Sequence, residues 1–278
     1  MLVNMNEYIK KAKREEYAIP QFNINNLEWT RFILEACEEN NSPVILGVSE
    51  SAIKYMGGYN TVSHIVANLV EYLHITIPVI LHLDHGKSYL SCKEAIDAGF
   101  TSVMIDASKL PIEENIIETK KVVEYAKEHN VSVEGEIGYI GTSNTSITMP
   151  SIEQVIKYVN ETNVDAVAPA LGSVHGIYKE EANLNFDMMI DLKNKINTPL
   201  VLHGGSGILD EKIKKAIKSG ISKLNINTDL QVAWATSVKE FLNNNDVYDP
   251  RVIIKSGEQA IKEVVYKKIE LFESSNKN

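Results

Sequence analysis

The chain has 278 residues, of which 44% are hydrophobic and 23% charged, and its formal net charge at pH 7 is -9. This composition is typical of a globular protein with a sizeable core. The acidic balance argues against a nucleic-acid or anionic-membrane surface, because phosphate backbones are bound by clustered Lys and Arg. It excludes no small anionic ligand, for which a few local donors suffice.

Cysteine usage and hydropathy indicate the compartment. Cys37 and Cys92 fall in helical patterns and give no disulfide framework. The amino terminus lacks the apolar core of a signal peptide, and no apolar run approaches the ~20 residues that span a bilayer. We therefore expect a soluble, cytoplasmic protein with no membrane partner.

Apolar segments that predict strands alternate with helical patterns along the chain. The first segment, Tyr17 to Ile24, is followed by the capping candidates Asn25 and Asn26 and then by a helical pattern that begins near Trp29. The chain is thus expected to begin with a strand. Further strands are predicted at 44–48, 79–83, 102–105, 131–137, 166–170, 199–202 and 221–226.

Helical patterns separate these strands. One begins at Pro111, one opens with a capping box formed by Ser151 and Gln154, and one is expected to be capped by Asp210 and to end near Gly220. The other helices are predicted at 61–73, 88–98, 186–196 and 230–242, with an extra C-terminal helix at about 257–272.

The strands are apolar throughout rather than alternating, which is typical of parallel sheets covered on both faces. Eight such units predict an α/β protein with a (β/α)8 TIM barrel and an extra C-terminal helix, in a single domain over residues 1–278. The alternative, an open doubly wound sheet, predicts a glycine-rich phosphate turn after the first strand. The segment PQFNINN contains no glycine, so the barrel is favoured.

Unusual polar residues follow the apolar runs. Asp84 and His85 end the third strand, where Gly86 is expected to break the pleat so that both side chains can share one pocket. The working face of a barrel is built from the C-terminal ends of its strands. We therefore expect one rim to gather these two residues with Asp106, Glu134, Glu136, His175, His203, Asn225, Asn227 and Thr228.

Three of these residues, His85, His175 and His203, each lie beside a glycine and come from separate strands. Three nitrogens with an open fourth position are typical of catalytic zinc. For any one of them a hydrogen-bonded rim histidine is the alternative. We expect His82 to be a core residue or to support a ligand, whereas His64, His74 and His129 are expected in helices as surface or packing residues.

The segments HGGSG and NINT follow the seventh and eighth strands. Barrels frequently bind phosphate between these two loops, although the glycines could simply form a turn. Zinc, a neighbouring acid and a phosphate site suit cleavage of a carbon–carbon bond in a phosphorylated hydroxy-ketone. Asp84 could move a proton on the other fragment, or it could merely orient His85.

The chain resembles the class II, metal-dependent fructose-bisphosphate and tagatose-bisphosphate aldolases over essentially its whole length. The resemblance is carried by QFNINNLEWT, PVILHLDHG, AIDAGFTSVMIDAS, VEGEIG, ALGSVHGIY, PLVLHGGSGI and SKLNINTD. It implies a lyase of carbohydrate metabolism and glycolysis, a homodimer or homotetramer, and retro-aldol cleavage that yields dihydroxyacetone phosphate.

The resemblance also implies roles for individual residues. His85, His175 and His203 match zinc ligands, Asp84 matches the catalytic proton donor, and Asp106 and Glu136 match a second or alternative metal site. Backbone oxygens near the phosphate loops match a monovalent-cation site for Na+ or K+. The positions that match substrate and phosphate contacts are Asn25, Ser49, Gly176, Gly204, Gly205, Ser206, Asn225, Ile226, Asn227 and Thr228.

Two departures from the family pattern bear on the substrate. The loop after the fifth strand, GYIGTSNTSITMP, lacks the acid that usually removes a proton from dihydroxyacetone phosphate; Tyr139 or a metal-bound water are candidates to replace it. Glu258 stands where bisphosphate aldolases donate an arginine to the neighbouring subunit's site, and a carboxylate there would repel a second phosphate.

Our first hypothesis is therefore an aldolase that yields dihydroxyacetone phosphate but takes a different aldehyde half, as in the related enzyme of inositol breakdown. The alternative within the same class is fructose- or tagatose-bisphosphate cleavage proper. A sugar-phosphate-binding paralogue with weak catalysis is the hypothesis from another class. A Schiff-base mechanism is disfavoured, because no lysine is evident at a strand end of the rim.

Overall fold

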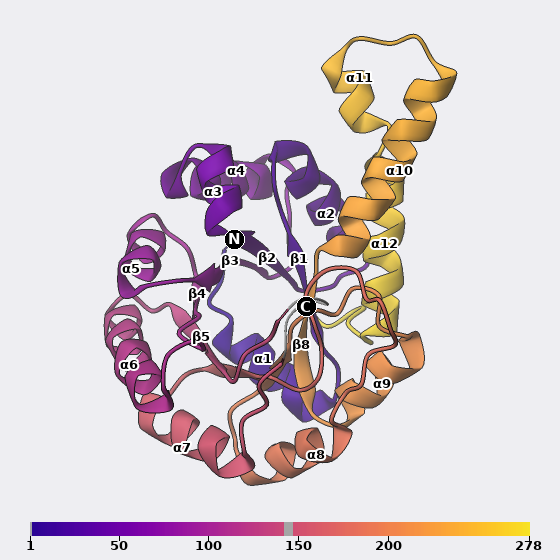
Figure 1. Ribbon diagram of the computed structural model, residues 1–278. Coiled ribbons are helices and arrows are strands. Elements are labelled where there is room, and N and C mark those ends of the chain that lie inside the picture. Colours follow the sequence, from indigo (N-terminus) through magenta and orange to yellow (C-terminus); the bar gives the residue numbers. More distant parts are fainter. Residues whose placement is uncertain (1, 142–146) are drawn as a thin grey trace.

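A computed structural model of the chain describes residues 2–141 and 147–278. It forms a closed barrel of parallel strands in chain order (Figure 1), which confirms the predicted TIM barrel. The first strand pairs with the last, Ile19 beside Lys223, and so closes the sheet. The strands are β1 (Ile19–Asn23), β2 (Val44–Ser49), β3 (Val79–Gly86), β4 (Ser102–Ile105), β5 (Ser132–Ile137), β6 (Ala166–Pro169), β7 (Leu200–Leu202) and β8 (Ile221–Ile226).

Helices surround the barrel in Figure 1, and in the described ranges none is long and apolar enough to cross a membrane. The helices are α1 (Asn6–Glu15), α2 (Leu27–Glu39), α3 (Glu50–Met56), α4 (Tyr59–Tyr72), α5 (Tyr89–Asp97), α6 (Ile112–Glu128), α7 (Ile152–Thr162), α8 (Phe186–Lys195), α9 (Asp210–Lys218), α10 (Thr228–Asn244), α11 (Pro250–Lys255) and α12 (Glu258–Leu271).

Helix α1 precedes the first strand, so the prediction that the chain begins with a strand was wrong. Its Ile9 and Ala12 are buried and pack in one apolar cluster with inward-facing barrel residues such as Ile19 and Ile80. The helix therefore covers one end of the barrel core. Its sequence, NEYIKKAKRE, is mostly polar, and two buried positions give too weak an apolar pattern to predict a helix.

Helix boundaries bear out some local predictions and correct others. Asn26 caps α2 through a bond from Trp29 N, and Ser151 and Gln154 form the predicted capping box of α7. Asp210, by contrast, is the first residue of α9, Leu209 occupies the N-cap position, and no side chain caps that helix. The short helices α3 and α11 were not predicted.

Only one of the three histidines expected in helices lies inside one. His64 is in α4, whereas His74 follows the end of α4 and His129 is the C-cap of α6. Both follow the last helical turn, where the helical sequence pattern is still present but the backbone has left the helix.

Polar residues occupy alternate positions in four strands and face the interior of the barrel, where they contact one another. Because strand side chains alternate between faces, the polar interior and the apolar outer face come from the same strands. The pairs are Gln21 and Asn23 in β1, His82 and Asp84 in β3, Glu134 and Glu136 in β5, and Lys223 and Asn225 in β8.

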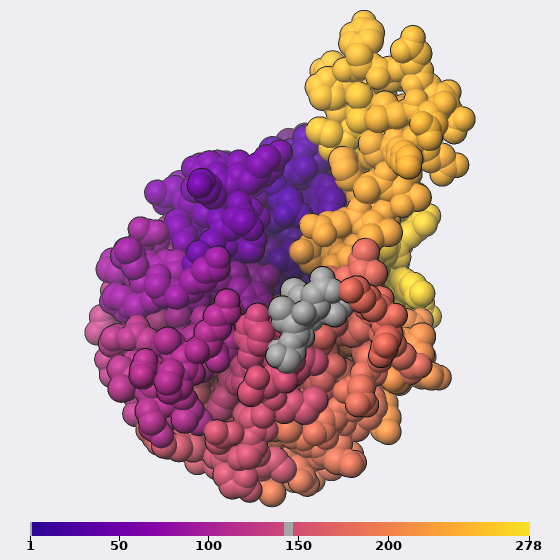
Figure 2. All heavy atoms as spheres, in the orientation of Figure 1, coloured from indigo at the N-terminus to yellow at the C-terminus, as the bar shows by residue number. Residues whose placement is uncertain are grey.

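An arm formed by α10, α11 and α12 projects from the barrel (Figures 1 and 2). In α10 only Leu230 and Val238 are buried, and α11 buries none of its residues. The arm exposes apolar side chains along its length, among them Val232, Leu242, Tyr248 and Val252.

Candidate active site

The end of β3 turns sharply so that two consecutive side chains reach the same pocket. His85 has a left-handed backbone with φ of 53°, and the pairing register of β3 with β4 shifts between Leu83 and Gly86. The pleat therefore breaks at His85, one residue before the glycine expected to break it. Gly86 is required for another reason: a Cβ atom there would lie 2.7 Å from Met104 O.

His85, His175 and His203 meet at this point. His85 Nε2 lies 3.0 Å from His203 Nδ1, and one candidate ligand atom from each of the three rings lies within 4.8 Å of the others. His175 Nε2 is buried and has no hydrogen-bond partner. Because buried ring nitrogens normally find partners, this arrangement fits a metal ion bound by three nitrogens.

Carboxylates hold two of these rings from behind. His85 Nδ1 lies 3.0 Å from Asp106 Oδ2, and His203 Nε2 lies 2.8 Å from Glu134 Oε1. An N–H donated to each carboxylate leaves the other ring nitrogen as a lone-pair donor that faces the shared space. Glu134 lies beneath His203 inside the barrel and not at the rim, where it was predicted.

The three imidazoles differ in charge. Burial, followed by the neighbouring histidines, lowers the pKa of His175 to about 3, and burial likewise lowers the pKa of His203. Burial also opposes the charge on His85, but the bond to Asp106 and the nearby carboxylates outweigh it and raise the His85 pKa to about 9. The metal-free cluster therefore holds one imidazolium, whose proton a metal ion would displace.

A second set of possible ligands shares His85. One ligand atom each from His85, Asp106 and Glu136 lies within 4.8 Å of the others. Glu136 Oε2 is buried without a hydrogen-bond partner, and burial, reinforced by Asp106, raises the Glu136 pKa to about 8. The structure brings together the residues predicted for a second or alternative metal site; metal binding there stays a prediction.

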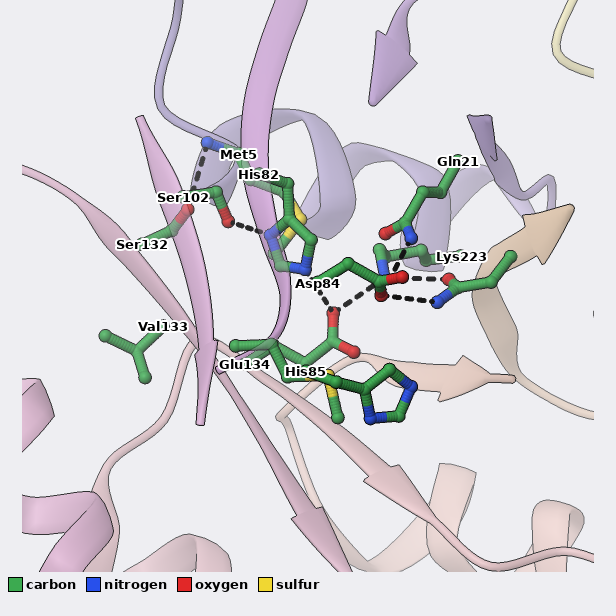
Figure 3. Close-up of polar contacts among 12 residues, drawn as sticks. Met5, Gln21, His82, Asp84, His85, Ser102, Ser132, Val133, Glu134 and Lys223 are labelled. Atoms are coloured by element: carbon green, nitrogen blue, oxygen red, sulfur yellow. Dashed lines mark hydrogen bonds and ion pairs between the residues drawn. The ribbon is translucent and has the colours of Figure 1, made fainter. Parts of the chain in front are cut away.

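Asp84 accepts hydrogen bonds from three amides, one each from Gln21 (3.0 Å), Asn23 (2.8 Å) and Asn225 (3.4 Å). Figure 3 shows its carboxylate facing the side-chain amide of Gln21. Burial opposes ionisation of Asp84, but His85 and the bond from Asn23 outweigh burial and hold its pKa well below the usual range. Asp84 is thus a carboxylate able to accept a proton.

Gln21 and Asn23 were missed at the sequence level. The signal was two polar residues spaced by two within an apolar strand, which places both on one face. Their contact with Asp84 spans more than sixty positions and depends on the register of the barrel.

A pocket of about 380 Å³ opens above Asp84 and His85. Five of the predicted residues do not line the pocket. His203 and Glu136 are buried behind its lining, and the other three are Asn25, Gly205 and Ile226. Asn23, which was not predicted, does line it. The predicted residues that line it are Ser49, Asp84, His85, Asp106, His175, Gly176, Gly204, Ser206, Asn225, Asn227 and Thr228.

Close packing orders the loops around the predicted phosphate site. The Tyr178 hydroxyl donates to Gly204 O and accepts from Val174 N, which ties the loop after β6 to the loop after β7. Gly204 has φ of 65°, and a Cβ atom there would lie 2.1 Å from Val174 O. Ser206 Oγ accepts the backbone N–H of Asn227, so the loops after β7 and β8 are joined as well.

The family model described as fructose-bisphosphate aldolase class-II matches residues 3–277. The chain belongs to the class II fructose-bisphosphate aldolase family. The predicted family, and a lyase that acts on a ketose bisphosphate, are thereby confirmed.

Individual relatives cover almost the whole of this aldolase. It is 52% identical over 282 residues to a fructose-bisphosphate aldolase of Staphylococcus aureus strain Mu50, with 99% of each chain covered. It is 51% identical to the fructose-bisphosphate aldolase of Geobacillus stearothermophilus, covering 99% of this chain and 98% of that one. The crystal structure of the YdjI aldolase from Escherichia coli K12 matches with a TM-score of 0.89 and 34% identity over 99% of this chain and 98% of that chain.

The loop after β5 forms one wall of the aldolase pocket. Tyr139, Ile140 and Gly141 line it, whereas 142–146, part of the segment predicted to lack the usual acid, fall outside the described residues. Lys109, which no sequence pattern indicated, has its Nζ 5.7 Å from the centre of the Tyr139 ring. Within 2–141 and 147–278, it is the one Lys or Arg that lines this pocket.

Glu258 does not line the pocket of its own chain. It is the first residue of α12, in the arm, and its carboxylate lies 3.5 Å from Lys262 Nζ. Its predicted position in a neighbouring subunit's site stays a prediction.

Proposed function

We propose that this aldolase, acting as one domain over residues 1–278, catalyses the reversible cleavage of fructose 1,6-bisphosphate to dihydroxyacetone phosphate and an aldehyde phosphate. The observation that carries the proposal is the carboxylate of Asp84, held by the amides of Gln21 and Asn23, beside three histidines that share one space. The relatives at 51–52% identity are named fructose-bisphosphate aldolases, which favours this substrate over a ketose with a different aldehyde half.

In this proposal His85, His175 and His203 hold Zn2+, and Asp106 and Glu136 belong to a second or alternative metal site. When bound, zinc would supply a Lewis acid that polarises the ketose C2 carbonyl. The buried, unpartnered Nε2 of His175 supports the assignment, because it lacks any other partner in the described structure.

Asp84 acts on the hydroxyl at C4 of the substrate. In the cleavage direction its carboxylate takes the hydroxyl proton, the C4–O bond becomes the aldehyde carbonyl, and the electron pair of the C3–C4 bond passes toward C2. C3 then gains a proton, for which the hydroxyl of Tyr139 in the pocket wall is our candidate donor, to give dihydroxyacetone phosphate. In the reverse direction Asp84 returns its proton, which matches its predicted role as a proton donor. The amides of Gln21 and Asn23 keep the carboxylate oriented throughout.

The loops after β6, β7 and β8 form the proposed site for the phosphate that stays on dihydroxyacetone. Gly176, Gly204, Ser206, Asn227 and Thr228 line this side of the pocket and offer backbone and hydroxyl donors. Gly205, Asn225 and Ile226 belong to the same loops and strand. Backbone oxygens near Gly176, Gly204 and Ser206 remain the predicted position of a Na+ or K+ ion.

We assign the distal phosphate to the opposite side of the pocket, where Lys109 supplies a side-chain cation. This assignment supports a bisphosphate substrate, because an ammonium beside the aldehyde half favours an anion there. Glu258, which motivated the hypothesis of a substrate without a distal phosphate, shares Lys262 with Glu35 and Glu39 in its own chain and does not line the pocket of that chain.

We further propose that the projecting arm joins subunits into a homodimer or homotetramer. Val232 and Val252, exposed by 51% and 44%, lie on α10 and α11, which bury little within one chain. Light scattering should give a multiple of the 31.1 kDa chain mass, and Val232→Asp should shift it toward the monomer. A monomeric unaltered protein would contradict this. A cytoplasmic location stays a prediction.

The proposed function is tested by comparing substrates on the zinc-loaded protein. Cleavage of fructose 1,6-bisphosphate, tagatose 1,6-bisphosphate and fructose 1-phosphate is followed by coupled assay, with and without EDTA. We expect fructose 1,6-bisphosphate to give the highest kcat/KM of the three substrates, and we expect EDTA to abolish cleavage. Preference for the monophosphate would restore the hypothesis of a different aldehyde half. Binding of these substrates without cleavage would favour the weakly catalytic paralogue. Cleavage that persists in EDTA would favour a Schiff-base mechanism.

A further inference from the structure

Lys223 is a fully buried lysine in β8, and the proposed chemistry does not use it. Its side chain points into the barrel beneath Asp84 and His85, where Figure 3 shows it beside Asp84. A lysine ammonium is expensive to bury unless it is paired and hydrogen-bonded. Two contacts compensate this burial. One is with a residue that holds the candidate metal ligand His203, and the other is with a residue that donates to Asp84.

The first set of contacts leads to a metal ligand. Lys223 Nζ lies 2.8 Å from Glu134 Oε2, and the other oxygen of the same carboxylate lies 2.8 Å from His203 Nε2. A charged, fixed carboxylate at this position accepts the Nε2–H of the ring, so that Nδ1 keeps its lone pair toward His85 and the shared space. Lys223 thus supports the ring orientation of His203 through one intervening residue.

The second set leads to the proton-transferring group. Lys223 Nζ donates to Asn225 Oδ1 at 2.8 Å. Because the ammonium takes the amide oxygen, the amide nitrogen must point the other way, and it lies 3.4 Å from Asp84 Oδ1 and 3.5 Å from His203 Nδ1. Lys223 therefore selects the orientation of Asn225 that donates to Asp84.

We propose that Lys223 is a positioning residue that orients the metal ligand His203 and the proton acceptor Asp84 at the same time. The proposal rests on the metal site of the proposed function. It assigns Lys223 no covalent role, because its Nζ is held by Glu134 and Asn225 below the pocket that the substrate would enter. A purely structural ion pair would contribute to stability and leave the metal site unchanged.

The test substitutes Lys223→Met, which keeps the length of the side chain and removes its charge. Lys268→Met is a matched control: Lys268 is also buried and lies 2.8 Å from Asp229 Oδ2, but in α12, outside the site. Zinc affinity is measured by competition with a chromophoric chelator, and ligand geometry by the visible spectrum of the Co2+ form. Circular dichroism and thermal melting report whether each variant folds.

We expect Lys223→Met to weaken zinc binding about 10–100-fold and to change the Co2+ spectrum, while Lys268→Met changes neither. Wild-type zinc affinity and spectrum in folded Lys223→Met would overturn the proposal. If that variant fails to fold, Lys223→Gln, which removes the charge and keeps a polar side chain in the barrel, is measured in its place, with the same two changes expected and the same result overturning the proposal. Failure of the unaltered chain to bind zinc would instead overturn the metal site itself.

Discussion

His85 Nε2 lies 3.0 Å from His203 Nδ1, and the second nitrogen of each ring is engaged by a different carboxylate, Asp106 for His85 and Glu134 for His203. Two ring nitrogens therefore face one another across a space that His175 also borders. In the metal-free protein the protonated His85 can donate its Nε2–H to His203 Nδ1, and a bound metal ion would replace that proton between the two rings. A metal ion in this space would be bound by one nitrogen from each of the three rings.

Removal of the third ring should cost metal binding. His175→Ala is expected to lower zinc affinity by at least about tenfold and cleavage with it, because a site with three protein ligands loses one of them. Chelator competition measures the affinity. His64→Ala, which removes an exposed histidine of α4, is the control and should bind zinc as the unaltered chain does. Equal affinity in the two variants would exclude His175 as a ligand.

Asp84 should be needed for turnover but not for metal binding. Asp84→Ala is expected to reduce kcat for cleavage by about 10²–10⁴-fold, the usual contribution of a positioned acid or base. Zinc content should be retained, because Asp84 belongs to neither group of candidate ligands. Metal analysis and steady-state kinetics on the same preparation separate the two effects. Unchanged turnover would remove Asp84 from the mechanism.

Zinc binding should strengthen as pH rises. The His85 pKa of about 9 means that this ring is protonated at pH 7 in the metal-free protein, whereas His175 and His203, whose pKa values are lowered, are neutral. A ligand must be neutral, so binding releases about one proton and the apparent affinity rises about tenfold per pH unit between pH 7 and 9. Calorimetry in two buffers of different ionisation enthalpy counts the proton. An affinity independent of pH would contradict the charge assigned to His85.

Lys109 should distinguish bisphosphate from monophosphate substrates. Lys109→Met is expected to raise KM for fructose 1,6-bisphosphate about tenfold, the loss of one charge-assisted contact at an exposed position. Kinetics with fructose 1-phosphate should be unaffected, because that substrate has no distal phosphate. Lys109→Arg keeps the charge and should restore most of the affinity. An equal change with both substrates would place Lys109 outside the distal phosphate site.

The barrel could be predicted because apolar segments alternate with helical patterns along the chain, a signal that needs no knowledge of distant contacts. The polar residues at alternate positions of four strands did not obscure this alternation. Helix α1 could not be predicted, because its two buried residues pack against side chains of β1, β2 and β3 that come together only in the closed barrel. The short helices α3 and α11 span 7 and 6 residues, too few for a helical period to be evident.

The rim residues could be predicted for a similar reason, since polar side chains such as Asp84 and His203 come directly after apolar runs. Inside the strands, Gln21 and Lys223 were missed and Glu134 was expected at the rim. All three act through partners that only the closed register of the barrel brings within reach. The turn at His85 was expected one residue later, because a glycine is the usual residue for a left-handed backbone and a histidine is not.

The central claim, a metal-dependent aldolase that binds dihydroxyacetone phosphate, is tested most directly by proton exchange at C3. The zinc-loaded protein is incubated with dihydroxyacetone phosphate in D2O, and the C3 proton signal is followed by NMR with and without EDTA. We predict loss of the signal with zinc and its persistence with EDTA. Persistence of the signal in the zinc-loaded protein, with dihydroxyacetone phosphate shown to be bound, would contradict the account.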